Sequence, residues 1–228
     1  MELSPRARTA ITINAGVAWF GIVLTVVLSA LGAYRDVKVD PGLYGDTGGG
    51  FAGAVSRTVD TLSYFTIWSN IVVAISVTLL LTRPLPDTWM RRVLRLDGLL
   101  MITVTMIVYQ VVLAPSVDVV GWSRLTDPTL HLVTPILTLV VWLVWGPRGW
   151  LTARLIPSAL IIPVVWVVWI LLRGAVVDAS PYDFVNVFRL GYAVVFRNVF
   201  FVLLLGLVIS AVLFGIETLL RRRAKVGS

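Results

Sequence analysis

Residues 198–216 read NVFFVLLLGLVISAVLFGI, nineteen consecutive positions without a charged side chain. A helix that crosses the hydrocarbon core of a bilayer needs about 20 mostly apolar residues. Similar stretches recur along the chain, of which 58% is hydrophobic and only 14% is charged. A soluble domain does not need this composition to fill a single core. The sequence therefore predicts helices that lie in lipid.

Five further apolar stretches bring the number of predicted transmembrane helices to six. The predicted spans are residues 10–34, 62–82, 94–114, 128–146, 154–173 and 192–219. Together they take up more than half of the chain, so a separate soluble domain has no room. We therefore expect residues 1–228 to form a single all-α integral membrane domain of six transmembrane helices.

The charged residues are distributed unevenly between the segments that join these spans. With the N-terminus inside, the inner segments hold twelve Lys and Arg and four Asp and Glu, against seven and eight outside. Cytoplasmic loops of membrane proteins carry such an excess of positive charge. We therefore predict a multi-pass protein of the cell membrane with both termini in the cytoplasm. The net charge of +7 belongs to this arrangement and not to a nucleic acid partner.

The residues available for chemistry are few, because the chain has no cysteine and a single histidine, His131. Thiolate catalysis and cysteine-bound metals are therefore excluded. A catalytic zinc site needs three convergent protein ligands, and no carboxylate lies well inside an apolar stretch to supplement His131. We predict no metal and no cofactor. Haem bound through His131 would lack a second histidine and would need Met106 as its other axial ligand.

Polar side chains cost free energy in hydrocarbon, so those inside a span normally face the interior of the bundle. Thr66 and Asn70 share one face of the second predicted span, and His131 lies near the start of the fourth. At about 1.5 Å of rise per residue, Thr66 lies roughly 9 Å below Asp60. On the same scale, His131 and Gln110 each lie roughly 6 Å below the outer ends of their helices. Three helices thus place polar residues in one shallow layer near the outer face.

These residue types have the parts of an acyl-transfer site. A threonine hydroxyl attacks a carbonyl carbon while a neutral imidazole takes its proton, which makes Thr66 the candidate nucleophile and His131 the candidate base. Side-chain amides and hydroxyls can donate to the developing oxyanion. The candidates for that role, or for binding substrate, are Ser69, Asn70 and Gln110. The alternative is structural: intramembrane Thr and Ser often bond their own helix backbone, and a single buried His often only packs.

Three short motifs resemble those of one family of membrane proteins. They are YFTIWSN at residues 64–70, His131 to Pro135 followed by Trp142, and RGA at 173–175 followed by PYDF at 181–184. Over most of the spans, the chain resembles small six-span bacterial relatives of the androgen-induced and androgen-dependent TFPI-regulating proteins of animals. The resemblance implies a threonine hydrolase of fatty acid esters of hydroxy fatty acids, with Thr66 and His131 as its catalytic pair.

Arg197 and Asn198, at the outer start of the sixth predicted span, are candidates for holding a fatty carboxylate. Arginine binds carboxylates in a bidentate manner, although Arg197 also fits an interfacial residue whose charged head reaches water. The expected partners are membrane lipids and a fatty acyl ester, and the sequence does not indicate an oligomeric state. The competing function is a non-enzymatic protein that binds or transports a lipid or another small molecule.

The segment at residues 35–60 is predicted to be a long outer loop, because its many glycines favour neither a helix nor a strand. Its glycine-rich part, residues 41–53, lacks the lysine and the strand-to-helix context of a phosphate-binding loop. We expect this part to be a linker or a flexible lid.

Overall fold

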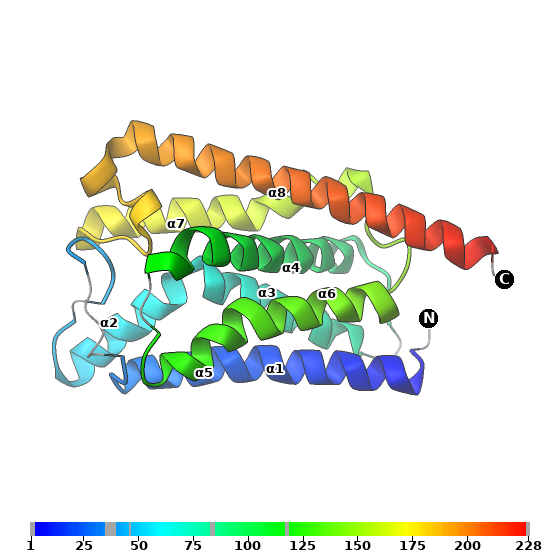
Figure 1. The fold of residues 1–228 in the computed structure, drawn as a ribbon, viewed down its shortest axis with the longest axis horizontal. Helices are drawn as coiled ribbons and strands as arrows, with labels where there is room; N and C mark the ends of the chain where they lie inside the picture. Colours follow the sequence, from blue (N-terminus) through cyan, green and yellow to red (C-terminus); the bar gives the residue numbers. More distant parts are fainter. Residues whose placement is uncertain (1–2, 35–39, 46, 83–84, 117–118, 227–228) are drawn as a thin grey trace.

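The computed structural model describes residues 3–34, 40–45, 47–82, 85–116 and 119–226. Within these ranges the chain forms helices and no strand, apart from one isolated bridge between Leu43 and Ser180. The α-helices, drawn in Figure 1, are α1 (Pro5–Ala30), α2 (Gly50–Ser63), α3 (Phe65–Leu80), α4 (Trp89–Val108), α5 (Ser123–Pro128), α6 (Thr134–Trp145), α7 (Ile161–Val177) and α8 (Val187–Val226). The π-helical turns are η1 (Tyr109–Leu113) and η3 (Thr129–Val133), and the 3-10 turns are η2 (Ala114–Ser116), η4 (Ala153–Leu155), η5 (Ser158–Leu160) and η6 (Asp183–Val185).

Five helical segments in the described ranges are long and apolar enough to cross a membrane. They are Pro5–Ala30, Trp89–Leu113, Ser123–Trp145, Ala153–Val177 and Val187–Arg222. Helices α2 and α3 add a sixth if they count as one broken span, since they meet at an angle of 71°. The break lies at Tyr64, whose extended backbone (φ −72°, ψ 137°) separates the two helices. The prediction of an all-helical chain with several helices of membrane-spanning length is confirmed.

Helix α2 shows that the prediction of an unstructured loop at residues 35–60 is wrong from Gly50 onward. The glycines of this segment let the chain turn tightly into the helix. Gly50 has a φ of +67°, which costs glycine little. A Cβ atom at Gly53 would lie 1.8 Å from the carbonyl oxygen of Gly48, so only glycine fits there. Residues 35–39 and 46 lie outside the described part of the chain.

Two other predicted spans differ from the helices at their starts. The fifth, residues 154–173, begins as the 3-10 turns η4 and η5, and α7 becomes regular only at Ile161. Pro157 lies between these turns and has no N–H for a helical hydrogen bond. The sixth predicted span, residues 192–219, begins where α8 changes direction at Gly191 (φ 75°, ψ 159°). L side chains rarely adopt that backbone conformation, so the glycine permits the bend.

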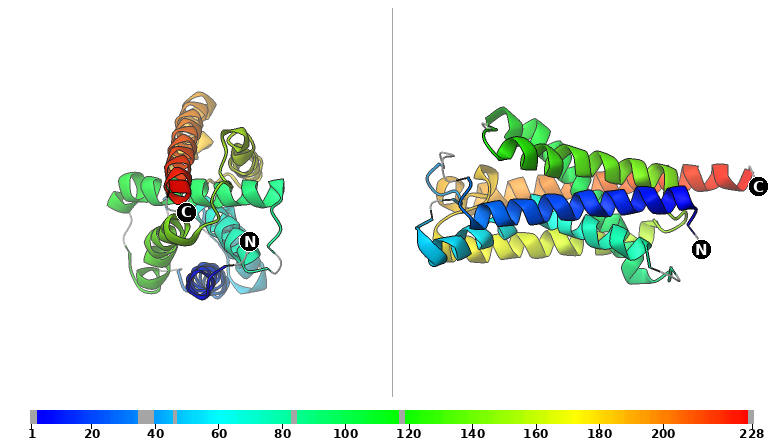
Figure 2. Two further views of the ribbon diagram at one scale, coloured as in Figure 1. Left: turned by 90° about the vertical axis from the view of Figure 1, so that its right-hand side faces the viewer. Right: turned by 90° about the horizontal axis from the view of Figure 1, so that it is seen from below.

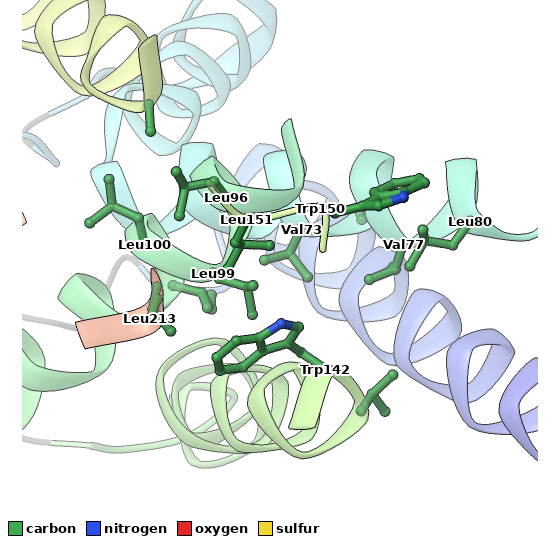
Figure 3. Close-up of a cluster of buried hydrophobic side chains, with 14 of the residues drawn as sticks. Val73, Val77, Leu80, Leu96, Leu99, Leu100, Trp142, Trp150, Leu151 and Leu213 are labelled. Atoms are coloured by element: carbon green, nitrogen blue, oxygen red, sulfur yellow. The ribbon is translucent and has the colours of Figure 1, made fainter. Parts of the chain in front are cut away.

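Helices α3 and α4 form the centre of the bundle, with α1, α6 and α8 packed around them. Figure 3 shows part of this core, where side chains of α3 and α4 meet Trp142 of α6. Trp142, Val73 and Leu99 are all 0–1% exposed. Lipid tails are as apolar as these side chains, so the hydrophobic effect does little to bring helices together in a membrane. Close packing of this kind holds them together instead.

The beginning of α1 and the end of α8 lie at the same end of the bundle (Figures 1 and 2). The opposite end, which we call the site end, holds α2, α5 and the segment that joins α7 to α8. The candidate catalytic residues lie toward the site end.

Buried charged side chains occur in the other half of the bundle. Arg95 and Glu217 are 1% exposed and Asp97 is 0% exposed. Asp97 corrects the expectation that no carboxylate lies well inside a span, since it belongs to the membrane-length segment Trp89–Leu113. At about 1.5 Å per residue, Asp97 lies about 18 Å along the helix from Tyr109, so it takes no direct part in the site described below.

Candidate active site

Thr66 is the second residue of α3 and directly follows the break at Tyr64. The first N–H groups of a helix have no partner within the helix, and the aligned peptide dipoles place partial positive charge there. A negative charge that develops beside Thr66 is therefore stabilised by the helix. The broken α2–α3 pair thus places a hydroxyl group in a favourable electrostatic position inside an apolar bundle.

The structure brings Thr66 and His131 together, with the Thr66 Oγ1 atom 3.0 Å from the His131 Nε2 atom. His131 is the middle residue of η3, in which the Thr134 N–H bonds to the Thr129 carbonyl five residues earlier. An α-helix here would need an N–H at residue 135 to bond the His131 carbonyl, and Pro135 has none. Such π-turns within helices occur frequently at functional sites.

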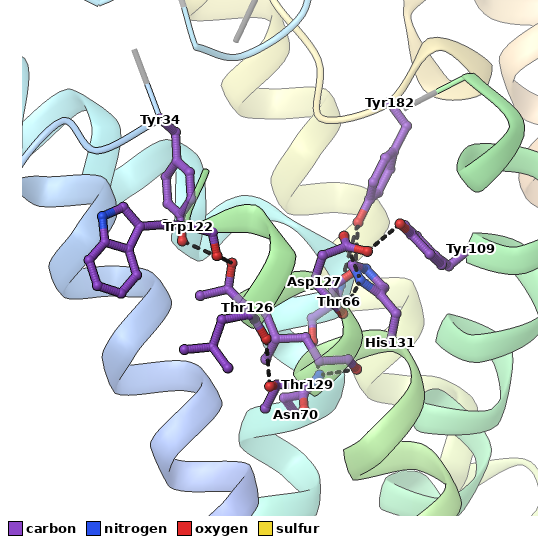
Figure 4. Close-up of polar contacts among 12 residues, drawn as sticks. Tyr34, Thr66, Asn70, Tyr109, Trp122, Thr126, Asp127, Thr129, His131 and Tyr182 are labelled. Atoms are coloured by element: carbon purple, nitrogen blue, oxygen red, sulfur yellow. Dashed lines mark hydrogen bonds and ion pairs between the residues drawn. The ribbon is translucent and has the colours of Figure 1, made fainter. Parts of the chain in front are cut away.

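Asp127 extends the pair to a chain of three side chains (Figure 4). Its Oδ1 atom lies 3.1 Å from the His131 Nδ1 atom, and its backbone carbonyl oxygen lies 3.0 Å from the same nitrogen. Both acceptors favour the tautomer that carries its proton on Nδ1. In that tautomer Nε2 is a free acceptor, as a base for Thr66 must be. Asp127 thus orients the imidazole, and its carboxylate is placed to stabilise an imidazolium at His131.

Tyr109 contacts both Asp127 and His131 and holds them in place. Its hydroxyl donates to the Oδ2 atom of Asp127, and its ring stacks on His131 with 3.8 Å between centroids and 14° between planes. Tyr109 is the first residue of η1, so each side of this stacked pair comes from a π-turn. Both carboxylate oxygens and one face of the imidazole therefore have partners, which restricts their movement.

Tyr182, from the segment between α7 and α8, approaches Thr66 from another direction. Its hydroxyl oxygen lies 3.4 Å from both the backbone nitrogen and the Oγ1 atom of Thr66. Burial raises the pKa of Tyr182, so the hydroxyl keeps its proton. The Thr66 N–H donates to the Tyr182 hydroxyl oxygen, so these two groups are bonded to each other in the unliganded site. A ligand oxygen that takes the place of this contact can accept from both the Tyr182 O–H and the Thr66 N–H, which is the arrangement an oxyanion needs.

An apolar cavity extends from Thr66 between α4, α7 and α8. It holds about 730 Å³ of space between the atoms, its open mouth included. The polar residues of its lining are Thr66, Thr105, Tyr109 and Tyr182. The Thr105 hydroxyl donates to Ser69, so it is already engaged. His131 does not line this cavity, whereas Thr66 does, so Thr66 lies between the cavity and His131.

Ser69 and Asn70 contact the backbone of Thr66 and not the cavity. The Ser69 hydroxyl donates to the Thr66 carbonyl at 2.8 Å. The Asn70 amide nitrogen donates to the same carbonyl at 2.8 Å and to the Leu130 carbonyl at 3.2 Å. Their hydrogens are therefore engaged, and we assign both residues to positioning. Asn70 in particular links the start of α3 to the helix that carries His131.

The remaining candidates from the sequence lie apart from this cluster. Gln110 is exposed and does not line the cavity. Its neighbour Tyr109 lies in the site instead. Arg197 is exposed on α8, and Asn198 donates from its side chain to the Phe184 carbonyl at 2.8 Å. Neither Arg197 nor Asn198 lines the cavity beside Thr66.

Three residues of the site did not emerge from the sequence: Tyr109, Asp127 and Tyr182. The sequence could have pointed to Asp127, because it precedes His131 by four residues and so shares its helical face. It pointed less clearly to Tyr109, as the neighbour of Gln110. Tyr182 belongs to the PYDF motif at residues 181–184, but the motif did not place it near Thr66, because only the folded segment between α7 and α8 brings it back to α3. Among the described residues, no group of three or more Asp, Glu and His side chains is arranged to hold a metal ion.

For an acyl-transfer reaction at Thr66, Tyr182→Phe is expected to lower kcat about 10- to 100-fold with little change in KM. The expected effect is below that of removing a sole oxyanion donor, because the Thr66 N–H remains as a second donor. Steady-state kinetics checks this, with Tyr192→Phe as the control, since Tyr192 is exposed on α8 and stacks on Phe196. An unchanged kcat in Tyr182→Phe would remove the residue from the site.

Comparison of this chain with family models, curated proteins and solved structures gave no match. The reaction proposed below therefore rests on the geometry of the site.

Proposed function

We propose that the chain is an intramembrane hydrolase of lipid esters in which Thr66 is the nucleophile and His131 its general base. The observation that carries the proposal is the continuous chain from Thr66 Oγ1 to His131 Nε2, and from His131 Nδ1 to Asp127. A hydroxyl, an imidazole and a carboxylate in this order form the general arrangement of acyl-transfer enzymes on unrelated folds. The adjoining apolar cavity supports a substrate with a hydrocarbon chain.

In the first half of the reaction, the Thr66 oxygen attacks the ester carbonyl carbon and His131 Nε2 takes the hydroxyl proton. The carbonyl oxygen becomes an oxyanion, which the Tyr182 O–H and the Thr66 N–H at the start of α3 stabilise. The intermediate collapses with cleavage of the bond to the alcohol oxygen. His131 returns the proton to that oxygen, so a neutral alcohol leaves and the acyl group stays on Thr66.

In the second half, a water molecule takes the place of the alcohol. His131 accepts a proton from the water as its oxygen attacks the acyl carbon, and the same donors stabilise the second oxyanion. Cleavage of the bond to Thr66 returns the proton to the threonine oxygen and releases a carboxylic acid. One ester and one water thus give one acid and one alcohol, and Asp127 itself takes up no proton in either half.

We further propose a six-span topology in the cell membrane, with α2 and α3 as one broken span and both termini in the cytoplasm. An even number of spans agrees with termini at one end of the bundle (Figure 1). The arginines near that end, among them Arg6, Arg148 and Arg221, support the cytoplasmic assignment. The site end would then face outward, where water can reach the acyl-enzyme.

The proposed substrates are fatty acid esters of hydroxy fatty acids or related esters, as in the androgen-induced and androgen-dependent TFPI-regulating proteins that the sequence resembles. The pairing of Thr66 with His131 supports cleavage of an ester, and the resemblance of the sequence suggests which esters. Purified protein in detergent is expected to release free fatty acid from such esters. An amide of the same fatty acid serves as the comparison, since its leaving group is poorer. No release above buffer from any fatty ester would refute the proposal.

A non-enzymatic lipid-binding protein is the second candidate, and the apolar cavity favours it. Mass spectrometry of the purified protein separates the two functions. A binding protein retains an intact ester equally in the parent and in Thr66→Ala. An enzyme retains intact ester in Thr66→Ala and only acid or alcohol in the parent.

A further inference from the structure

The cavity beside Thr66 has a polar end and an apolar end. Thr66, Tyr109 and Tyr182 mark the polar end, whereas Leu100 and Gly206 line the part furthest along α4 and α8. No charged residue belongs to the lining. A charged group placed at the far end would therefore lose its hydration without gaining a partner. The occupant must be uncharged along its whole length, as the acyl chain of an ester is.

The length of the cavity follows from the helices that line it. Leu100 of α4 and Tyr109, the first residue of η1, are nine residues apart on one continuous helical segment, which corresponds to about 13 Å at about 1.5 Å per residue. Val199 and Gly206 are seven residues apart on α8, or about 10 Å on the same scale. An extended hydrocarbon chain advances about 1.25 Å per carbon, from standard bond lengths and angles. The cavity therefore matches a chain of about eight to ten carbons.

Gly206 leaves space at the far end that any side chain would reduce. It is buried in the interior of α8, where glycine is less favourable than alanine. A Cβ atom at Gly206 would lie 3.5 Å from Leu100 Cδ1 and 3.6 Å from Leu160 Cδ2, at ordinary contact distances. Alanine therefore fits without movement of its neighbours. A longer side chain has to enter the cavity or displace these two leucines.

We infer that Gly206, with Leu100 and Leu160, forms the floor of an acyl-chain site and limits the preferred substrates to esters of medium-chain acids. This inference rests on the proposed function for its reaction, but the floor itself is a property of binding. Leu100 comes from α4, Leu160 from η5 and Gly206 from α8, so the floor is fixed by three separate segments. Longer chains have to bend or leave their ends in the open mouth.

The test uses p-nitrophenyl esters with acyl chains of four to sixteen carbons. The parent is expected to show its highest kcat/KM near eight to ten carbons. Gly206→Leu should lower kcat/KM for the ten-carbon ester by at least about tenfold relative to the four-carbon ester, because overfilling an apolar pocket excludes a longer chain. Gly206→Ala should shift the preference less. Gly215→Leu is the matched control, because Gly215 lies on the same helix with open space around it.

A second measurement separates the floor from the chemistry. Native mass spectrometry of Thr66→Ala with n-alcohols of six to sixteen carbons reports chain binding without reaction. Loss of ten-carbon binding in Thr66→Ala/Gly206→Leu, with six-carbon binding kept, supports the floor even if no ester is hydrolysed. Identical chain-length profiles for the parent and a folded Gly206→Leu, in either assay, would overturn the floor and leave the hydrolase proposal standing. A thermal melt establishes whether Gly206→Leu is folded. If it is not, the chain-length profile of Gly206→Ala is compared with that of the parent, and an identical profile overturns the floor.

Discussion

Thr66→Ala protein is expected to lose ester hydrolysis by on the order of 10³-fold or more, equal to about 4 kcal/mol of transition-state stabilisation. The substitution removes the oxygen that we propose forms the acyl-enzyme. His131, Asp127 and Tyr182 all remain, so any residual rate comes from water activated by His131. Binding of the acyl chain should persist, because the cavity lining changes by a single small side chain.

Two variants make this expectation specific. Thr66→Ser keeps the hydroxyl within reach of His131 and should retain activity within about tenfold of the parent. Thr78 lies further along the same helix, where its hydroxyl donates to the Ala74 carbonyl and accepts from Trp19 Nε1 of α1, so Thr78→Ala removes hydrogen bonds far from the site and should be unchanged in kcat. Hydrolysis by Thr66→Ala at the rate of the parent would show that another group is the nucleophile.

Asp127→Asn is expected to lower kcat by on the order of 10²-fold or more with little effect on KM. Asparagine removes the negative charge that stabilises the protonated imidazole. Its amide can also donate to Nδ1 and so favour the tautomer with the proton on Nε2, which cannot accept from Thr66. The Asp127 backbone carbonyl still accepts from Nδ1 at 3.0 Å, which preserves part of the rate.

The kinetic effect of Asp127→Asn can be checked against a spectroscopic one. The ¹⁵N shifts of the single histidine report its tautomer directly, so the parent should show protonated Nδ1 and Asp127→Asn a larger share of protonated Nε2. Asp183→Asn is the control, since Asp183 pairs with Arg189 at the surface of the site end. A kcat within threefold of the parent, with an unchanged tautomer, would remove Asp127 from the mechanism.

The apolar stretches made the helical fold predictable, because lipid requires long uncharged helices and few other structures. The exceptions lie where the backbone is irregular. Helix α2 was missed because glycines at its start look like a loop in the sequence, while in the structure they permit a tight turn. Asp97 was missed as a buried carboxylate because it stands next to basic residues that resemble a helix end.

The candidate site was predictable in part. Thr66 and His131 stood out because a polar residue in an apolar span needs an explanation. The depth of a residue along its span does not determine the direction in which its side chain points. Gln110 was therefore predicted at the position that Tyr109 occupies. The π-turn at Tyr109–Leu113 changes the direction in which these side chains point, and regular helical spacing does not reveal it. Tyr182 depends on a contact between segments more than a hundred residues apart.

The most direct test of the central claim is the position of a covalent adduct. The parent is treated with a fluorophosphonate that carries a ten-carbon chain, digested, and mapped by mass spectrometry. A single adduct on Thr66, absent from Thr66→Ala and strongly slowed in Asp127→Asn, is the predicted result. An adduct on Ser69 or on any other residue, or no adduct in protein that hydrolyses esters, would contradict the assignment of Thr66 as the nucleophile.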